Sequence, residues 1–172
     1  MTLPELDAWN EDGELNVVVE SPRGSTLKFE YDQHLRVFTV ARSLPVGLAY
    51  PFDWGFVPGT QADDGDPVDA LVIHDAATFT GVLLPCKVLG MVVVQQRVGP
   101  TSRLQINNRI LATPVWHGRM GELEEPTDLP RKLREEVEQF FIGATFHTDK
   151  HPEVQGWKGA AAATKFIKSQ ES

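Results

Sequence analysis

Short apolar runs alternate with polar turns over the first two-thirds of the chain. The runs at 15–20, 26–31 and 36–41 are rich in Val, Phe and Thr, and the segments between them, 21–25 and 32–34, have loop composition. Further runs follow at 68–73, 82–94 and 109–113. Short β-branched and aromatic runs bounded by Gly, Pro, Asp and Ser are typical of strands, so the pattern predicts a mainly β protein.

Helical signals come only near the C-terminus. Asp128, with Pro130 close behind it, predicts the start of a helix that continues through Phe140 and Phe141 and stops at Gly143. A second, alanine-rich helix is predicted over 158–168. Several short strands followed by two helices indicate a closed or nearly closed β-barrel with the helices packed outside.

Length and composition limit the classes of protein that fit. With 172 residues, of which 41% are hydrophobic, the chain predicts a single domain over 1–172. No apolar run approaches the roughly 20 residues that cross a bilayer. Residues 1–7 lack the basic start and apolar run of a signal peptide, and the single cysteine, Cys86, cannot form an internal disulfide. Both observations predict a cytoplasmic location.

The formal net charge of −8 argues against a nucleic-acid binder, which normally carries a basic face. The same charge disfavours an anionic substrate unless metal ions lie between the two. Bound cations invert the local charge, so an acidic protein that handles phosphate through a metal is physically coherent.

The acidic segment Asp64-Gly65-Asp66-Pro67-Val68-Asp69 places three carboxylates within six residues. Carboxylates this close raise one another's pKa unless a cation lies between them, and Gly65 and Pro67 predict a turn that keeps them together. Oxygen ligands favour a hard divalent ion, Mg²⁺ first, with Mn²⁺ and Ca²⁺ behind it. A solvated acidic turn that only caps a strand is the other interpretation of this segment.

Three further features could either belong to a functional site or have an ordinary structural role. Strand alternation puts Lys28 and Glu30 on one face, Arg42 follows a strand directly, and Tyr50 and Trp54 flank a proline. Each has an ordinary explanation on its own: an ion pair on a sheet, an arginine at a strand end, and aromatic core residues.

Taken together and in order, these features resemble the soluble family I inorganic pyrophosphatases. The resemblance covers nearly the whole chain and is strongest between 20 and 75. The matching motifs are Glu20-x-Pro22, Lys28-x-Glu30, Arg42, Tyr50-Pro51, Gly55, the acidic segment, Val88-Leu89-Gly90, Phe140-Phe141 and Gly156-Trp157.

The resemblance implies a five-stranded barrel of OB type with flanking helices, and hydrolysis of pyrophosphate to two phosphates with Mg²⁺. It also implies a homo-oligomer, since bacterial members form hexamers. Asp66 would accept a proton from the attacking water or orient the hydroxide, and Asp69 would bridge two metal ions. The implied metal ligands are Asp64, Asp69, Glu30 and Asn107. The implied substrate-binding residues are Lys28, Arg42, Trp54 and Arg109.

The chain departs from the family pattern in the second half of the site. Gln96 and Asn107 align where the family has aspartates, and Arg109 aligns with a lysine. Ala144-Thr145 stands where the family has a Tyr-Lys pair that holds the leaving phosphate, and Trp54 replaces a tyrosine. These substitutions predict at least one weakened metal site, and turnover that is reduced or altered in specificity. Lys150 could reach in from the following loop.

Two alternatives to an active pyrophosphatase remain open from the sequence. The substitutions also suit a non-hydrolysing relative that binds a phosphate-containing ligand or a protein partner. An OB-type barrel could instead bind single-stranded nucleic acid by stacking bases on Trp54 and Phe56, although the charge of −8 disfavours this function.

Overall fold

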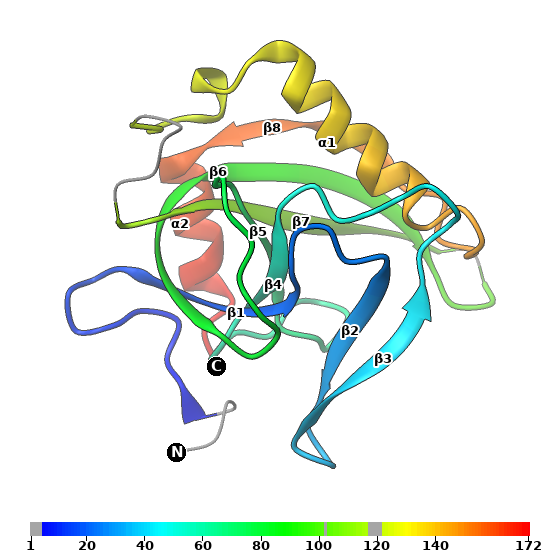
Figure 1. Ribbon diagram of the computed structural model, residues 1–172, viewed down its shortest axis with the longest axis horizontal. Helices are drawn as coiled ribbons and strands as arrows, with labels where there is room; N and C mark the ends of the chain where they lie inside the picture. Colours follow the sequence, from blue (N-terminus) through cyan, green and yellow to red (C-terminus); the bar gives the residue numbers. More distant parts are fainter. Residues whose placement is uncertain (1–4, 102, 117–121) are drawn as a thin grey trace.

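Five strands form a closed ring of backbone pairing at the centre of the computed structural model, which describes residues 5–101, 103–116 and 122–172 (Figure 1). The order around the ring is β1-β4-β5-β7-β6, and β6 pairs again with β1. Only the β5–β7 pair in this ring is parallel. The strands are β1 (Leu15–Ser21), β4 (Asp53–Val57), β5 (Val68–Val72), β6 (Leu83–Val98) and β7 (Arg103–Pro114). This arrangement confirms the predicted five-stranded OB-type barrel.

Three more strands lie outside the ring. β2 (Leu27–Asp32) and β3 (Val37–Ser43) form a separate two-stranded ribbon, here called the β2–β3 ribbon. β8 (Glu153–Gly159) pairs antiparallel with β6. The prediction of a helix beginning at residue 158 was wrong, because Lys158 pairs with Met91 in this sheet.

The helices differ from the prediction mainly at their starts. Asp128 ends a 3₁₀ turn, η2 (Pro126–Asp128), and its carboxylate accepts the backbone N–H groups of Glu124 and Glu125 at 2.9 Å each. The first α-helix, α1 (Arg131–Gly143), begins only after Pro130. The second, α2 (Ala160–Ser169), follows β8 directly. Among the described residues, no helix is both long and apolar enough to cross a membrane.

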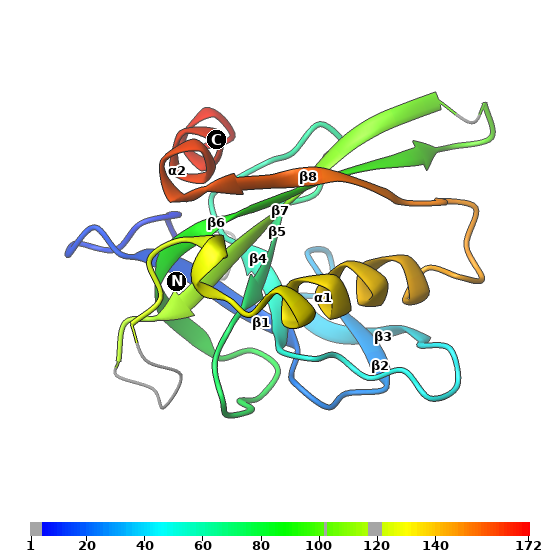
Figure 2. The same cartoon turned by 90° about the horizontal axis from the view of Figure 1, so that it is seen from above.

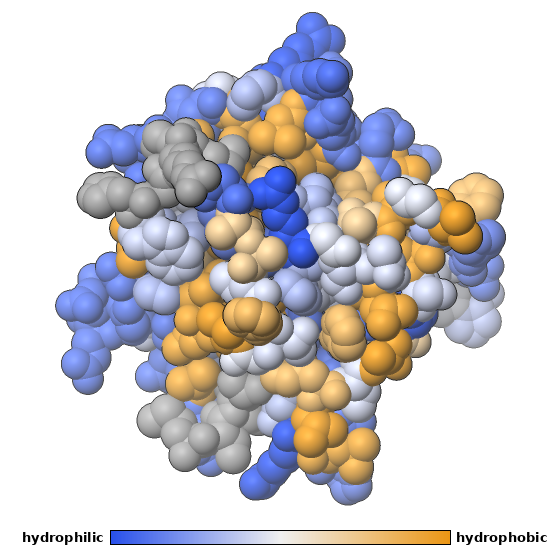
Figure 3. Space-filling view, in the orientation of Figure 1, coloured by the Kyte–Doolittle hydropathy of each residue, from blue (hydrophilic) through white to orange (hydrophobic). Residues whose placement is uncertain are grey.

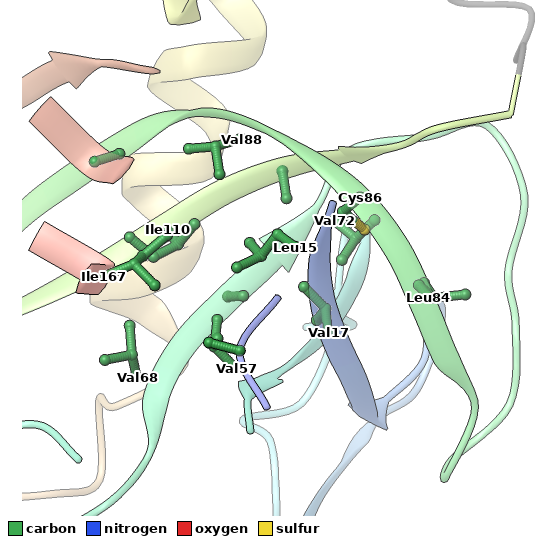
Figure 4. Packing of buried hydrophobic residues seen from close by; sticks show 14 of the residues in the cluster. Leu15, Val17, Val57, Val68, Val72, Leu84, Cys86, Val88, Ile110 and Ile167 are labelled. Carbon is green, nitrogen blue, oxygen red and sulfur yellow. The ribbon is translucent and has the colours of Figure 1, made fainter. Parts of the chain in front are cut away.

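The barrel interior is filled by small branched side chains. Val17, Val57, Val72 and Ile110 are fully buried in this cluster, and Ile167 of α2 joins them (Figure 4). Helix α2 therefore contributes to the barrel's own core as well as lying outside the strands. Cys86 belongs to the same cluster, and burial raises the pKa of its thiol, which makes it an unreactive core residue.

A second core lies between the outer face of the barrel and α1. In Figure 2, α1 runs between β8 and the β2–β3 ribbon. Val137, Phe140 and Phe141 follow helical spacing and pack against Leu71, Leu111 and their neighbours. Burying each phenylalanine contributes about 2–3 kcal/mol. This packing holds the C-terminal end of α1 beside Trp54.

Gly55 lets β1 and β4 approach closely. A Cβ at this position would lie 1.9 Å from the carbonyl oxygen of Val18, so only glycine fits. The neighbouring side chains of Trp54 and Phe56, two residues apart on β4, share one face of the strand. On the face of the molecule seen in Figure 3, apolar residues form several patches separated by polar ones.

Candidate active site

A cleft of about 390 Å³ opens between the β2–β3 ribbon and the barrel. Beside it is a smaller pocket of about 60 Å³ that reaches the end of α1. The two share five lining residues, namely Lys28, Trp54, Asp69, Asn107 and Lys150. We call them the large cleft and the small pocket.

All nine residues predicted from the sequence line one or both of these cavities. Glu30, Asp64 and Asp66 line the large cleft, and Arg42 and Arg109 line the small pocket. The other four, Lys28, Trp54, Asp69 and Asn107, belong to both. Gln96 is in neither lining, and its side chain is buried on β6 opposite Gln105. The substitution at Gln96 therefore lies outside the walls of the site.

The acidic segment forms the turn that its composition predicts. Gly65 adopts a φ of +89°, the left-handed region that suits glycine, and the backbone N–H of Asp66 donates to Asp64 Oδ1 at 3.1 Å. Ala62 closes the turn by donating its N–H to the carbonyl of Asp66 at 2.7 Å. Asp69 follows on β5, paired with Phe56, so three aspartates reach the cleft from a turn and the adjoining strand.

The β2–β3 ribbon supplies the opposite wall. Lys28 pairs with Arg42 across the ribbon, which brings both cations to one end of it. Lys28 Nζ forms an ion pair with Glu30 Oε1. The ribbon therefore brings two cations and one carboxylate to the site, with Lys28 and Glu30 at the large cleft and Arg42 at the small pocket.

Three carboxyl groups of the cleft, those of Asp69, Glu20 and Asp66, have raised pKa values. Burial raises the pKa of Asp69 to about 6, although Arg109 and Lys28 oppose the shift. Burial also raises the pKa of Glu20 to about 7, despite the N–H that Tyr31 donates to its Oε1 at 2.9 Å. The pKa of Asp66 rises through partial burial and the nearby charges of Asp64 and Glu30. Carboxylates held this way attract a cation.

The donor set fits a hydrated divalent ion. In the part of the chain that the structure describes, no three His, Cys, Asp or Glu side chains converge closely enough to hold a metal by themselves. Mg²⁺ keeps several waters and is commonly held by one or two carboxylates together with substrate phosphates. The oxygen-only ligands of this wall suit that form of binding better than a closed protein cage.

Arg109 provides a buried cation at the small pocket. Its side chain is only 6% exposed, and its guanidinium lies 4.6 Å from the ring centre of Phe141 and 5.7 Å from that of Trp54. Its Nε and Nη1 atoms are buried and have no hydrogen-bond partner among the described residues. Buried donors without acceptors are costly, so this end of the site favours an anion.

Two further residues, to which the sequence assigned no role in catalysis or binding, also reach the site. Glu20 lines the large cleft, and the Glu20-x-Pro22 motif was the signal for it. Lys150 lines both cavities, and partial burial together with the charge of Lys28 lowers the pKa of its amine. The N–H of Arg97 holds this loop by donating to the Lys150 carbonyl at 2.7 Å, a tertiary contact with no local sequence signal.

A second polar cluster surrounds Asp53, the first residue of β4. Its fully buried carboxylate contacts His74 Nε2 at 2.8 Å and accepts the Thr78 hydroxyl at 2.8 Å and the Arg23 N–H at 2.8 Å. Burial opposes ionisation, but these bonds outweigh it and hold the pKa of Asp53 below its ordinary value. The cluster ties the start of β4 to the segments that follow β1 and β5.

Comparisons with known proteins agree with this geometry. The family model described as inorganic pyrophosphatase matches residues 17–172. The inorganic pyrophosphatase of Synechocystis sp. is 32% identical over 167 residues, which cover 97% of this chain and 95% of the relative. That of Aquifex pyrophilus is 33% identical over 164 residues, covering 92% and 88%.

Solved structures give the same result. The crystal structure of inorganic pyrophosphatase from Thermus thermophilus superposes with a TM-score of 0.88 at 28% identity, covering 99% of this chain and 97% of that one. The structure from Neisseria gonorrhoeae gives a TM-score of 0.84 at 29% identity, covering 98% and 95%. The chain therefore belongs to the inorganic pyrophosphatase family.

Proposed function

We propose that this protein hydrolyses inorganic pyrophosphate to two phosphates, with Mg²⁺ as the working cation and Mn²⁺ as a substitute. The family generally uses a divalent metal. The observation that carries the proposal is that Asp64, Asp66 and Asp69 share one continuous site with Lys28, Arg42 and Arg109. Hydrolysis of so densely charged a substrate depends mainly on neutralising charge and positioning the nucleophile.

Asp64, Asp69 and Glu30 would hold the divalent ion. When bound, such an ion polarises phosphate oxygens and lowers the pKa of coordinated water. The raised pKa of Asp69 supports this role, because a cation beside the carboxylate relieves the cost of its burial. Asn107 was predicted as a further ligand, but it brings only a neutral amide to the wall.

Asp66 is the proton acceptor or the group that orients the attacking water. Its raised pKa brings it closer to neutral pH, where a general base works best. The water oxygen forms a new bond to one phosphorus while the bond from that phosphorus to the bridging oxygen breaks. Lys28, Arg42 and Arg109 neutralise the charge that develops on the departing phosphate, and Trp54 holds the Arg109 guanidinium in place.

A second candidate function is binding of a phosphate-containing ligand without turnover, or of a protein partner. The end of α1 favours it, because Ala144 and Thr145 offer the small pocket neither a phenol nor an ammonium group. The Thr145 hydroxyl also turns back to the carbonyl of Ile142 at 3.2 Å. The cations of the small pocket would serve binding and hydrolysis equally, so turnover has to be measured.

The test is phosphate release from Mg-pyrophosphate by wild type, Asp66→Asn and Asp63→Asn. Asp63 belongs to the same acidic stretch but lies outside the lining of both cavities, so it is the matched control. We expect Asp66→Asn to lose at least about 100-fold in kcat and Asp63→Asn to stay near wild type. Equal background rates for wild type and Asp66→Asn would end the proposal. Tight calorimetric binding of Mg-pyrophosphate without turnover would favour the second candidate.

We also propose a single domain over residues 1–172, a homo-oligomer with the hexamer as the first expectation from family resemblance, and a cytoplasmic location. The continuous pairing from β1 through β8 supports the single domain, since it links the N-terminal and C-terminal parts in one sheet. Sedimentation equilibrium would determine the oligomeric state.

A further inference from the structure

Asn107 lies at the boundary between two halves of the site with opposite charge. It lines both the large cleft and the small pocket. On β7 it is two residues from Arg109, so their side chains lie on the same face of the strand. Its pairing opposite Val94 fixes that orientation.

The small pocket is strongly cationic. Its lining contains Lys28, Arg42, Arg109 and Lys150, whereas Asp69 is its only carboxylate among the described residues. The other acids of the site, Glu20, Glu30, Asp64 and Asp66, line the large cleft alone. Four cations against one carboxylate repel a divalent metal and attract an anion.

The small pocket also has donors that await an acceptor. Arg109 Nε and Nη1 are buried without a partner among the described residues, and Phe141 and Trp54 cover the guanidinium. A phosphate oxygen would satisfy these donors in a site that aromatic rings partly shield from water. The amide of Asn107 can act in two ways, since its oxygen can bind a metal and its NH₂ can donate to an anion.

We propose that Asn107 donates its side-chain NH₂ directly to an oxygen of the phosphoryl group that Arg109 and its neighbouring cations attract into the small pocket, with no divalent cation between Asn107 and that oxygen. This inference rests on the proposed function, because the phosphoryl group is taken to be one half of pyrophosphate. It replaces the role of Asn107 as a metal ligand. The divalent ion then belongs only to the large cleft, whose wall carries the carboxylates.

The first experiment measures anion binding without metal. Inorganic phosphate and methylenediphosphonate, a diphosphonate that cannot be hydrolysed, are titrated calorimetrically into wild type, Asn107→Ala and Asn108→Ala in EDTA. Asn108 is the matched control, because it is the next residue on β7 and is outside the lining of both cavities. We expect wild type and Asn108→Ala to bind and Asn107→Ala to bind about 10-fold more weakly. Absence of binding until Mg²⁺ is added, or equal binding by Asn107→Ala, would overturn the proposal.

The second experiment uses Asn107→Asp, which keeps the shape of the side chain and adds a negative charge. We expect phosphate binding in EDTA to weaken about 10-fold and Mn²⁺ binding, measured without phosphate, to tighten about 10-fold. If Asn107 were already a metal ligand, Asn107→Ala would weaken Mn²⁺ binding as Asp64→Asn does, and the proposal would be wrong. Thermal melting of each variant separates these effects from misfolding. Neither experiment depends on turnover, so failure here is distinguishable from failure of the hydrolase proposal.

Discussion

The carboxylates of Asp53 and Asp69 have opposite environments, although they lie on neighbouring strands: Asp53 is fully buried, and Asp69 is half-buried at the cleft. Asp53 has His74, Thr78 and the Arg23 N–H around it, and its pKa is lowered. The pKa of Asp69 is raised to about 6, because burial outweighs the influence of Arg109 and Lys28. The protein itself supplies the hydrogen-bond partners of the Asp53 carboxylate, whereas the Asp69 carboxylate has room beside it for a cation or a ligand. A pKa that burial within a cleft has raised is expected of a carboxyl group with a function in binding or catalysis.

The position of the two groups in the fold explains the difference. Asp53 begins β4 and bonds to residues from the segments that follow β1 and β5, so its bonds serve stability. Asp69 projects from β5 into the cleft, where hydrogen-bond donors from the protein would compete with a bound ion. Stability and function therefore place opposite demands on the same type of side chain.

The largest expected effect comes from Asp69→Asn. Turnover should fall by about 10³-fold or more, since the site loses a central carboxylate. The free energy of unfolding of the metal-free protein should rise by about 1–3 kcal/mol at neutral pH, because the cost of burying the charge disappears. Phosphate release and urea unfolding in EDTA measure the two quantities. A stable but fully active variant would remove Asp69 from the site.

Asp53→Ala should have the reverse outcome. We expect a loss of about 3 kcal/mol in the free energy of unfolding, because His74 and Thr78 lose their buried partner, while the folded fraction keeps most of its activity. Urea unfolding at pH 7 measures the loss. Asp63→Asn, a change of an exposed aspartate, is the control and should be nearly neutral. If Asp53→Ala were equally stable, the contrast between the two sites would fail.

The pH dependence of the free energy of unfolding of the metal-free protein should distinguish carboxyl groups with raised pKa values from those with lowered ones. The pKa values of Asp69 and Glu20 are raised from 3.8 and 4.5 to about 6 and about 7. Protonation of these groups therefore stabilises the folded state, fully so at a pH below 3.8 and 4.5 respectively. This stabilisation is lost as the pH rises through 6 and 7. The lowered pKa of Asp53 acts in the opposite direction, because its contribution is present above 3.8 and is lost only as the pH falls further.

In EDTA, the free energy of unfolding should therefore decrease by about 2–4 kcal/mol between pH 4.5 and about 7.5. Saturating Mg²⁺ should flatten this slope, because the cation stabilises the ionised carboxylates. Urea unfolding at several pH values with and without Mg²⁺ gives both curves. Identical slopes would show that no ion binds these groups.

Lys150→Met should give the smallest of these effects, about 10-fold in kcat/KM. Stability should change little, because the residue as a whole is exposed and only its amine is partly enclosed by the two cavities. Lys150 is one of four cations around the small pocket, so the other three retain most of the attraction for phosphate. Steady-state hydrolysis measures the change, and Lys165→Met on the exposed side of α2 is the control. An unchanged kcat/KM would limit Lys150 to a role in the structure of its loop.

Much of the fold was predictable because strand signals are local. The runs that became β1, β2, β3 and β5 were located to within a residue or two at each end. The prediction failed at β8, where Gly156 and Gly159 weaken the strand pattern and an alanine-rich segment follows. It also failed at the start of α1, because Asp128 caps a separate 3₁₀ turn.

The sequence by itself determined the family, through an ordered series of motifs along the chain, and it determined the strands and the acidic turn, because these depend on residues that are adjacent or nearly so. Only the tertiary structure decided which residues meet across the site. The β6–β7 register places Asn107 opposite Val94 and Gln96 opposite Gln105, and it leaves Gln96 outside the cavity walls. Backbone pairing likewise brings Lys150 to the cations. Such long-range contacts depend on register and loop path, which no local pattern of residues encodes.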